Sequence, residues 1–70
     1  MFWWFKRGDD YIRYEARQIA VGRYELSVIS VDGSERVERF ADERELLDRQ
    51  RLLESNLAGE GFTGPHGWNL

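Results

Sequence analysis

Two neighbouring segments of the chain alternate apolar and polar side chains, and this pattern limits the fold more than any other feature. They cover residues 11–20 and 23–31, with apolar positions at Ile12, Tyr14 and Ala16 and at Tyr24, Leu26 and Val28. Successive side chains of a strand point to opposite faces, so a period of two is typical of a strand with one buried face. Gly22 provides backbone freedom for a turn between them. We therefore expect an antiparallel pair of strands.

A further strand is predicted on each side of this pair. Residues 2–6 are mostly aromatic, and Gly8-Asp9-Asp10 after them has the composition of a hairpin turn. At the other end, Asp32-Gly33 predicts a two-residue type I′ turn. The fourth strand then covers residues 35–40.

The predicted turn at Asp32-Gly33 also sets a register. It places Val28 opposite Val37, with both side chains on the core face. The same register turns Phe40 to the opposite face. Either a bulge intervenes, or the chain has left the sheet at Phe40 and this side chain packs against the helix that follows; we favour the second interpretation.

A helix is predicted to follow the fourth strand. Asp42 and Glu45 form a capping-box pattern that favours a helix start at this point. Gly59 and Gly61 favour an end near Ala58. Apolar or neutral residues recur at intervals of three and four along one face, namely Leu46, Leu47, Gln50, Leu53 and Leu57.

Together these elements predict an α+β fold, an antiparallel four-stranded meander (ββββα) with one C-terminal amphipathic helix packed on one face. The predicted core joins the helix face to the sheet positions Ile12, Tyr14, Ala16, Leu26, Val28 and Val37. We expect residues 1–62 to form a single domain. Residues 63–70 contain two glycines and a proline without periodicity, so they are predicted to be a flexible C-terminal tail.

Composition restricts how such a short chain is stabilised and where it works. The 70 residues include no cysteine and one histidine, so we expect packing, without disulfide or metal, to hold the domain. The apolar N-terminus is too short for a signal peptide, and no segment approaches a membrane span. A cytoplasmic protein is the expectation. A net charge of −3 excludes the strongly basic surface of a dedicated duplex-DNA binder.

No residue pattern predicts catalysis, a cofactor or a metal. His66 is the only histidine and lies in the predicted tail, without a nucleophile or metal ligands nearby in sequence. The paired carboxylates lie in turns and at the helix start, where exposed charge is expected. Gly59-Glu60-Gly61 follows a helix, whereas phosphate-binding glycines precede one. We expect a protein that is not an enzyme.

What remains is a binding surface, in which aromatic and basic residues interleave along the first three strands. Its predicted members are Trp3, Trp4, Lys6, Arg7, Tyr11, Arg13, Arg17 and Arg23. Trp3 and Trp4 are adjacent in a strand, so one of the two is expected in the core.

Two roles are compatible with this surface. The first is a non-enzymatic binding or dimerisation module, whose partner is another protein or a second copy of the chain, since a sheet covered by one helix keeps one open face and two edges. The alternative is binding of single-stranded nucleic acid, whose bases stack on aromatic rings while cations contact the phosphates.

Overall fold

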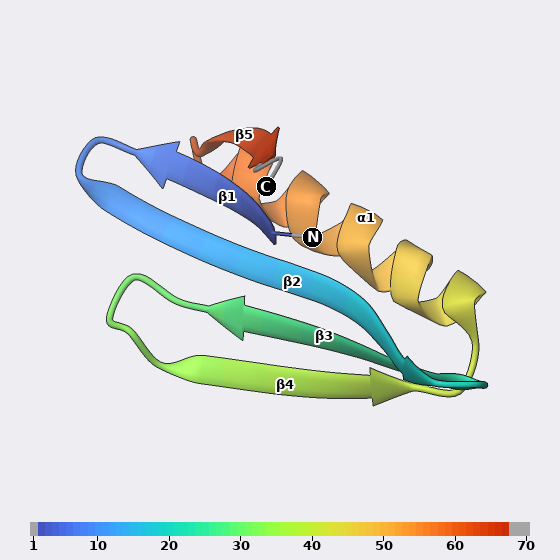
Figure 1. The fold of residues 1–70 in the computed structure, drawn as a ribbon. Coiled ribbons are helices and arrows are strands. Elements are labelled where there is room, and N and C mark those ends of the chain that lie inside the picture. The colour runs from blue at the N-terminus through green and yellow to red at the C-terminus, as the bar shows by residue number, and fades with distance from the viewer. Residues whose placement is uncertain (1, 68–70) are drawn as a thin grey trace.

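The computed structural model describes residues 2–67 and contains one sheet and one helix (Figure 1). Four strands come first: β1 (Phe2–Arg7), β2 (Asp10–Ala20), β3 (Arg23–Ile29) and β4 (Glu35–Phe40). They are followed by the helix α1 (Glu43–Gly59) and a last strand, β5 (Thr63–Gly67). No helix within residues 2–67 is both long and apolar enough to cross a membrane.

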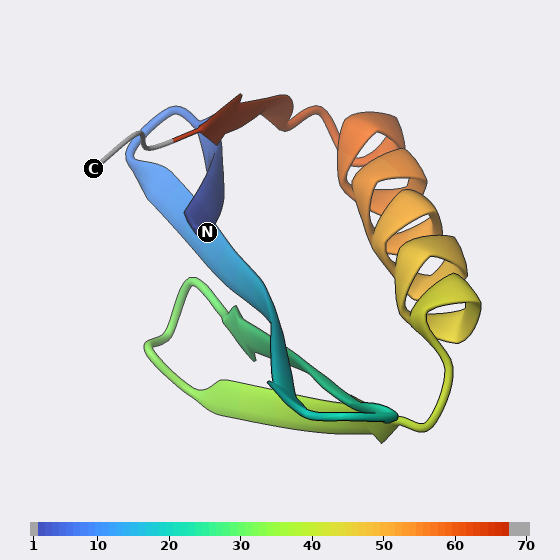
Figure 2. The same ribbon diagram turned by 45° about the vertical axis from the view of Figure 1, so that its right-hand side comes forward.

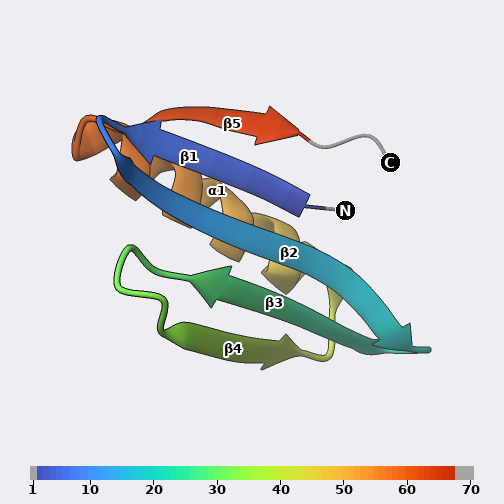
Figure 3. The same ribbon diagram turned by 60° about the vertical axis from the view of Figure 1, so that its left-hand side comes forward.

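The strands form a single antiparallel sheet in the order β4-β3-β2-β1-β5. The helix lies across one face, and the opposite face is left open by the described elements (Figures 2 and 3). We call these the helix face and the outer face. The predicted α+β class, with an antiparallel sheet and one helix, is confirmed.

The predicted strand number is wrong, because the sheet has five strands and not four. Residues 63–67, predicted as part of a flexible tail, form β5 and pair with β1. The remainder of that predicted tail, residues 68–70, lies outside the described residues. Phe62, between the helix and β5, is buried in the core, and the chain after it pairs alongside β1 at the edge of the sheet.

The register between β3 and β4 differs by one residue from the prediction. Three residues, 31–33, form the loop: the Gly33 N–H donates to the Ser30 carbonyl, and Gly33 has a φ of +87°. This geometry is a three-residue hairpin and not a two-residue type I′ turn. A shift of one residue exchanges the faces of every side chain in the strand.

Val37 and Phe40 therefore both differ from expectation. Val37 lies opposite Ser27 on the outer face and is 43% exposed, so it is not part of the core. Phe40 remains in the sheet as the last residue of β4, opposite Tyr24, and packs against the core from the helix face.

The core lies between the helix and the helix face of the sheet. Its buried side chains come from β1, β2, β3, α1 and the residue before β5, and they are Phe5, Tyr14, Leu26, Leu46, Leu57 and Phe62. Of the predicted helix positions, Leu47 is 43% exposed and lies at the flank of the interface. Aromatic side chains supply much of the buried area, as expected in so small a domain.

One polar contact caps the start of the helix, and another holds the helix against the sheet. Asp42 is the N-cap, and its Oδ1 accepts from the Arg44 N–H at 2.8 Å. Across the core, the Tyr14 hydroxyl donates to Glu54 Oε1 at 2.5 Å. Burial, followed by this hydrogen bond to Glu54, raises the pKa of Tyr14, so its hydroxyl remains a donor at neutral pH.

Candidate functional site: the outer face of the sheet

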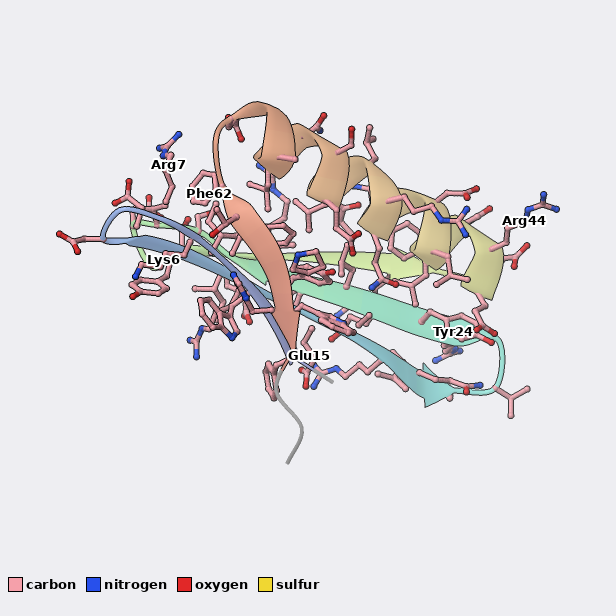
Figure 4. All side chains as sticks on the ribbon, turned by 90° about the horizontal axis from the view of Figure 1, so that it is seen from above. Lys6, Arg7, Glu15, Tyr24, Arg44 and Phe62 are labelled. Carbon is pink, nitrogen blue, oxygen red and sulfur yellow. The ribbon has the colours of Figure 1, made fainter. Side chains whose placement is uncertain are left out.

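The predicted binding residues divide between the two faces of the sheet. Strand alternation and cross-strand pairing place six of them on the outer face: Trp4, Lys6, Tyr11, Arg13, Arg17 and Arg23. The other two, Trp3 and Arg7, lie on the helix face. Figure 4 shows Lys6 on the side away from the helix and Arg7 on the helix side, near Phe62.

Trp3 and Arg7 take part in packing. Trp3 packs against the buried core, as expected for one of the two adjacent tryptophans. The Arg7 guanidinium lies 4.5 Å from the centre of the Phe62 ring and donates to the Glu60 carbonyl at 2.9 Å. It also approaches Asp10 at 3.6 Å. These contacts join the helix end to the first hairpin.

Three aromatic rings gather on the outer face where β5, β1 and β2 lie side by side. The Trp4 ring stacks on the His66 ring, with centroids 4.2 Å apart and an interplanar angle of 28°. Tyr11 is 51% exposed, and its ring centre is 6.0 Å from that of Trp4. We call Trp4, Tyr11 and His66 the aromatic patch.

Two exposed cations border the aromatic patch. Lys6 is paired with Tyr11 across the strands, and its Nζ lies 5.8 Å from the Tyr11 ring centre. Arg13 is the cross-strand partner of Trp4. Within residues 2–67, neither cation is bound to a carboxylate. The patch therefore combines accessible π faces with uncompensated positive charge.

His66 is the member that was missing from the predicted surface, and two glycines bring it there. A Cβ atom on Gly64 would lie 2.9 Å from Phe5 Cδ1 and from the Trp4 carbonyl oxygen, and Gly64 has a φ of +140°. A Cβ on Gly67 would lie 2.8 Å from Cζ3 of Trp3. Only glycine fits so close to these rings. The glycines on either side of His66 were the one sequence sign of this approach.

Further along β2, charged side chains of the outer face form ion pairs with one another. Glu25 is buried, and its carboxylate accepts from Arg17 Nη2 at 2.7 Å and from Arg39 Nε at 3.4 Å. Arg17 also approaches Glu15 at 3.2 Å. The Arg17 hydrogen bond holds the pKa of Glu25 below its usual value, although desolvation opposes this shift. Arg17 is therefore committed to a network within the chain.

Arg23 lies far from the aromatic patch. It borders an open groove of about 650 Å³ at the opposite end of β2, with Ile19, Tyr24, Arg39 and Phe40. Lys6 pairs with Tyr11, and Arg23 pairs with Ala20. At about 3.3 Å per residue, these positions are roughly 30 Å apart along β2. The predicted surface thus separates into the patch, the Arg17 network and a distal cation.

Next to the patch the outer face has a shallow hollow of about 290 Å³. Its outer-face lining consists of Phe2, Arg13, Glu15, Ser27, Ile29 and Glu35. Because two carboxylates line it, the hollow suits an uncharged ring better than a phosphate group.

Comparison with known proteins adds no family: no protein-family model, curated protein or solved structure matches the chain. Among residues 2–67 there is also no group of three or more histidine, cysteine or acidic side chains placed to hold a metal ion. The chemistry of the outer face is therefore the basis for assigning a role.

Proposed function

We propose that the chain is a small non-enzymatic binding module that binds its partner through the aromatic patch. The observation that supports this most directly is the stacked Trp4–His66 pair, which lies beside Tyr11 on a face that the described elements leave open. Large apolar rings displayed together on a surface favour contact with another molecule. Three elements, β5, β1 and β2, cooperate to hold these rings in position.

Single-stranded nucleic acid is the partner class that this chemistry favours. Stacking of a base on an aromatic side chain contributes about 1–3 kcal/mol, and nearby cations contact the sugar-phosphate backbone. Tyr11 offers an accessible ring, while Lys6 supplies charge directly opposite it on β1 and Arg13 supplies charge two residues further along β2. The patch is small, so a short segment of a few nucleotides fits it.

Dimerisation, the other role expected from the sequence, draws its support from a different part of the molecule. At the centre of the outer face, the carboxylate of Glu25 is already paired with Arg17 and Arg39 of the same chain. These charged groups therefore need no second copy to cover them. The support for self-association comes instead from the sheet edge formed by β4.

Binding is tested by fluorescence anisotropy with labelled single-stranded oligonucleotides of about ten nucleotides, DNA and RNA, at low and near-physiological salt. Tyr11→Ala removes an exposed ring, and we expect the affinity to fall by between fivefold and a hundredfold. Arg13→Gln removes one cation, and it should reduce the slope of log affinity against log salt by about 0.7.

Arg44→Gln is the matched control, because it removes the same charge from an exposed position at the start of the helix (Figure 4). We expect this variant to change neither the affinity nor the salt slope by a measurable amount. The proposal for nucleic acid is wrong if the wild-type chain fails to bind at low salt, or if Arg44→Gln weakens binding as much as Arg13→Gln does.

A further inference from the structure

Strand β4 forms one edge of the sheet, and within residues 2–67 no strand pairs with its outer side (Figure 3). Its register with β3 continues from Glu35 to Phe40 without a bulge. Natural sheets commonly protect such edges with proline, bulges or charged side chains. β4 has neither proline nor bulge, and its four charges are of both signs.

The hydrogen-bond pattern shows which backbone groups of β4 point outward. The Ser30 N–H donates to the Ser34 carbonyl at 2.9 Å, which makes these two residues a hydrogen-bonded pair. In an antiparallel ladder such pairs alternate with non-hydrogen-bonded pairs. Every second residue after Ser34 therefore bonds to β3. The backbone N–H and C=O groups of Glu35, Val37 and Arg39 are directed away from the sheet.

The sequence of this edge is complementary to itself when read antiparallel. In a pairing of two β4 strands centred on Val37, Glu35 lies opposite the Arg39 of a second copy, and Arg36 lies opposite its Glu38. Val37 then meets the Val37 of that copy, and both are exposed in the single chain. Opposite charges placed directly across from one another stabilise a strand pair, and like charges destabilise it.

We propose that a second copy of this chain pairs with β4 in this register, so that two five-stranded sheets join into one continuous antiparallel sheet. This register also agrees with the direction of the backbone groups. The residues whose N–H and C=O groups point outward meet one another as hydrogen-bonded pairs: Glu35 with Arg39 of the second copy, and Val37 with its Val37. The interface is isologous, as required for a closed dimer. The inference does not depend on the nucleic-acid proposal.

Neighbouring registers are unfavourable. In any alternative register, the outward-facing residues of the two copies must still lie opposite one another. The centre of the pairing must therefore coincide with a residue of β4, because a centre between two residues places outward-facing residues opposite inward-facing ones. A centre at Arg36 sets two arginines against each other, and a centre at Glu38 sets two glutamates against each other. Likewise, a centre at Glu35 sets two glutamates against each other, and a centre at Arg39 sets two arginines against each other. The register centred on Val37 avoids every like-charge pair.

The edge charges are held in place and still have capacity for a partner. Glu38 accepts from Arg49 Nε at 3.0 and 3.1 Å, and Glu35 Oε2 accepts from Ser27 Oγ at 2.8 Å. A carboxylate offers about four lone-pair sites, so each can accept further bonds. Arg39 uses only its Nε toward Glu25. Arg36 is exposed and, within residues 2–67, makes no ion pair.

The expected dimer is concentration-dependent, since an edge of six residues extends only about 20 Å. Analytical ultracentrifugation over a range of protein concentrations measures it. Position 36 of each copy faces position 38 of the other, so the interface contains this contact twice. Arg36→Glu places two glutamates opposite each other at both contacts, and Glu38→Arg places two arginines opposite each other at both. We expect each variant alone to raise the dimer Kd tenfold or more.

An equimolar mixture of these two variants is the sharper test. In the mixed dimer Glu at position 36 meets Arg at position 38 of the other chain, and the two native residues also meet, so association should return. Arg44→Glu is the matched control, with the same charge change on the helix, and it should dimerise like the wild type. Circular dichroism establishes that each variant is folded.

Amide hydrogen exchange gives an independent readout on the wild-type chain. The amides of Glu35, Val37 and Arg39 should become protected as concentration rises, whereas those of Arg36 and Glu38 should be protected throughout. A wild-type chain that stays monomeric at about millimolar concentration overturns the proposal. So does a dimer that Arg36→Glu leaves intact, or a dimer whose formation does not protect the amide of Val37.

Discussion

Replacing Tyr14 by phenylalanine would remove one hydroxyl from the centre of the domain while keeping the ring. The ring is 1% exposed, so its packing should remain. The hydroxyl donates at 2.5 Å to Glu54, 40 residues away in the chain, and thereby joins β2 to the helix. A hydrogen bond to a charged group contributes about 1.5–3 kcal/mol. Glu54 is only half-buried and can recover a bond to water, which favours the lower part of this range.

We therefore expect Tyr14→Phe to lower the free energy of unfolding by about 1.5–2 kcal/mol. In a domain of this size, each kcal/mol shifts the melting temperature by about 4–8 °C, so the midpoint should fall by roughly 6–16 °C. Urea and thermal unfolding followed by circular dichroism measure both quantities. Tyr24→Phe is the control, because Tyr24 is partly buried and its hydroxyl makes no hydrogen bond within residues 2–67.

The dependence on pH tests the burial of this hydroxyl together with its hydrogen bond to Glu54. Tyr14 has a raised pKa in the folded chain, so the stability linked to its protonated hydroxyl is fully present below the unfolded value of 10.0. This stability is lost as the pH rises above 10. The difference between wild type and Tyr14→Phe should therefore shrink in strongly alkaline solution. Equal losses in Tyr14→Phe and Tyr24→Phe, or a change below about 0.5 kcal/mol in the former, would refute this reasoning.

Two other substitutions test the elements that build the outer face. Gly64→Ala places a Cβ 2.9 Å from the Phe5 ring at a φ of +140°, so it should destabilise the domain by about 2 kcal/mol or more and abolish the stacking shift of the His66 ring protons in NMR spectra. Gly22→Ala, with a φ of +69° and open space around it, should cost less, and equal costs would contradict the account. The pKa of Glu25 is lowered by its hydrogen bond from Arg17, so its contribution to stability is present above pH 4.5 and lost as the pH falls through the lower folded value. Acid unfolding of Glu25→Gln should lack this contribution, and parallel pH profiles of variant and wild type over the acid range would show the reasoning to be wrong.

Side-chain periodicity and capping chemistry were sufficient to predict most elements of the fold. Tyr14 and Leu26 are buried where the alternation of their strands indicated, and Asp42 caps the helix as the capping pattern predicted. Such local patterns are readable because each depends on residues only a few positions apart. The separation of Trp3 from Trp4 also follows from strand alternation. Strand alternation alone does not determine which of the two tryptophans packs against the core.

Tertiary structure decided the register of β4 and the place of β5. The loop at residues 31–33 has one residue more than Asp32-Gly33 predicts, and this single residue moves Val37 to the outer face and Phe40 to the core. Loop length depends on how β3 and β4 pack together, which a dipeptide does not encode. β5 has no apolar periodicity, because its side chains are exposed and two of its residues are glycines. Its partner β1 lies at the other end of the chain, so the fifth strand, and with it the position of His66 beside Trp4, arises only when the two ends of the sequence meet.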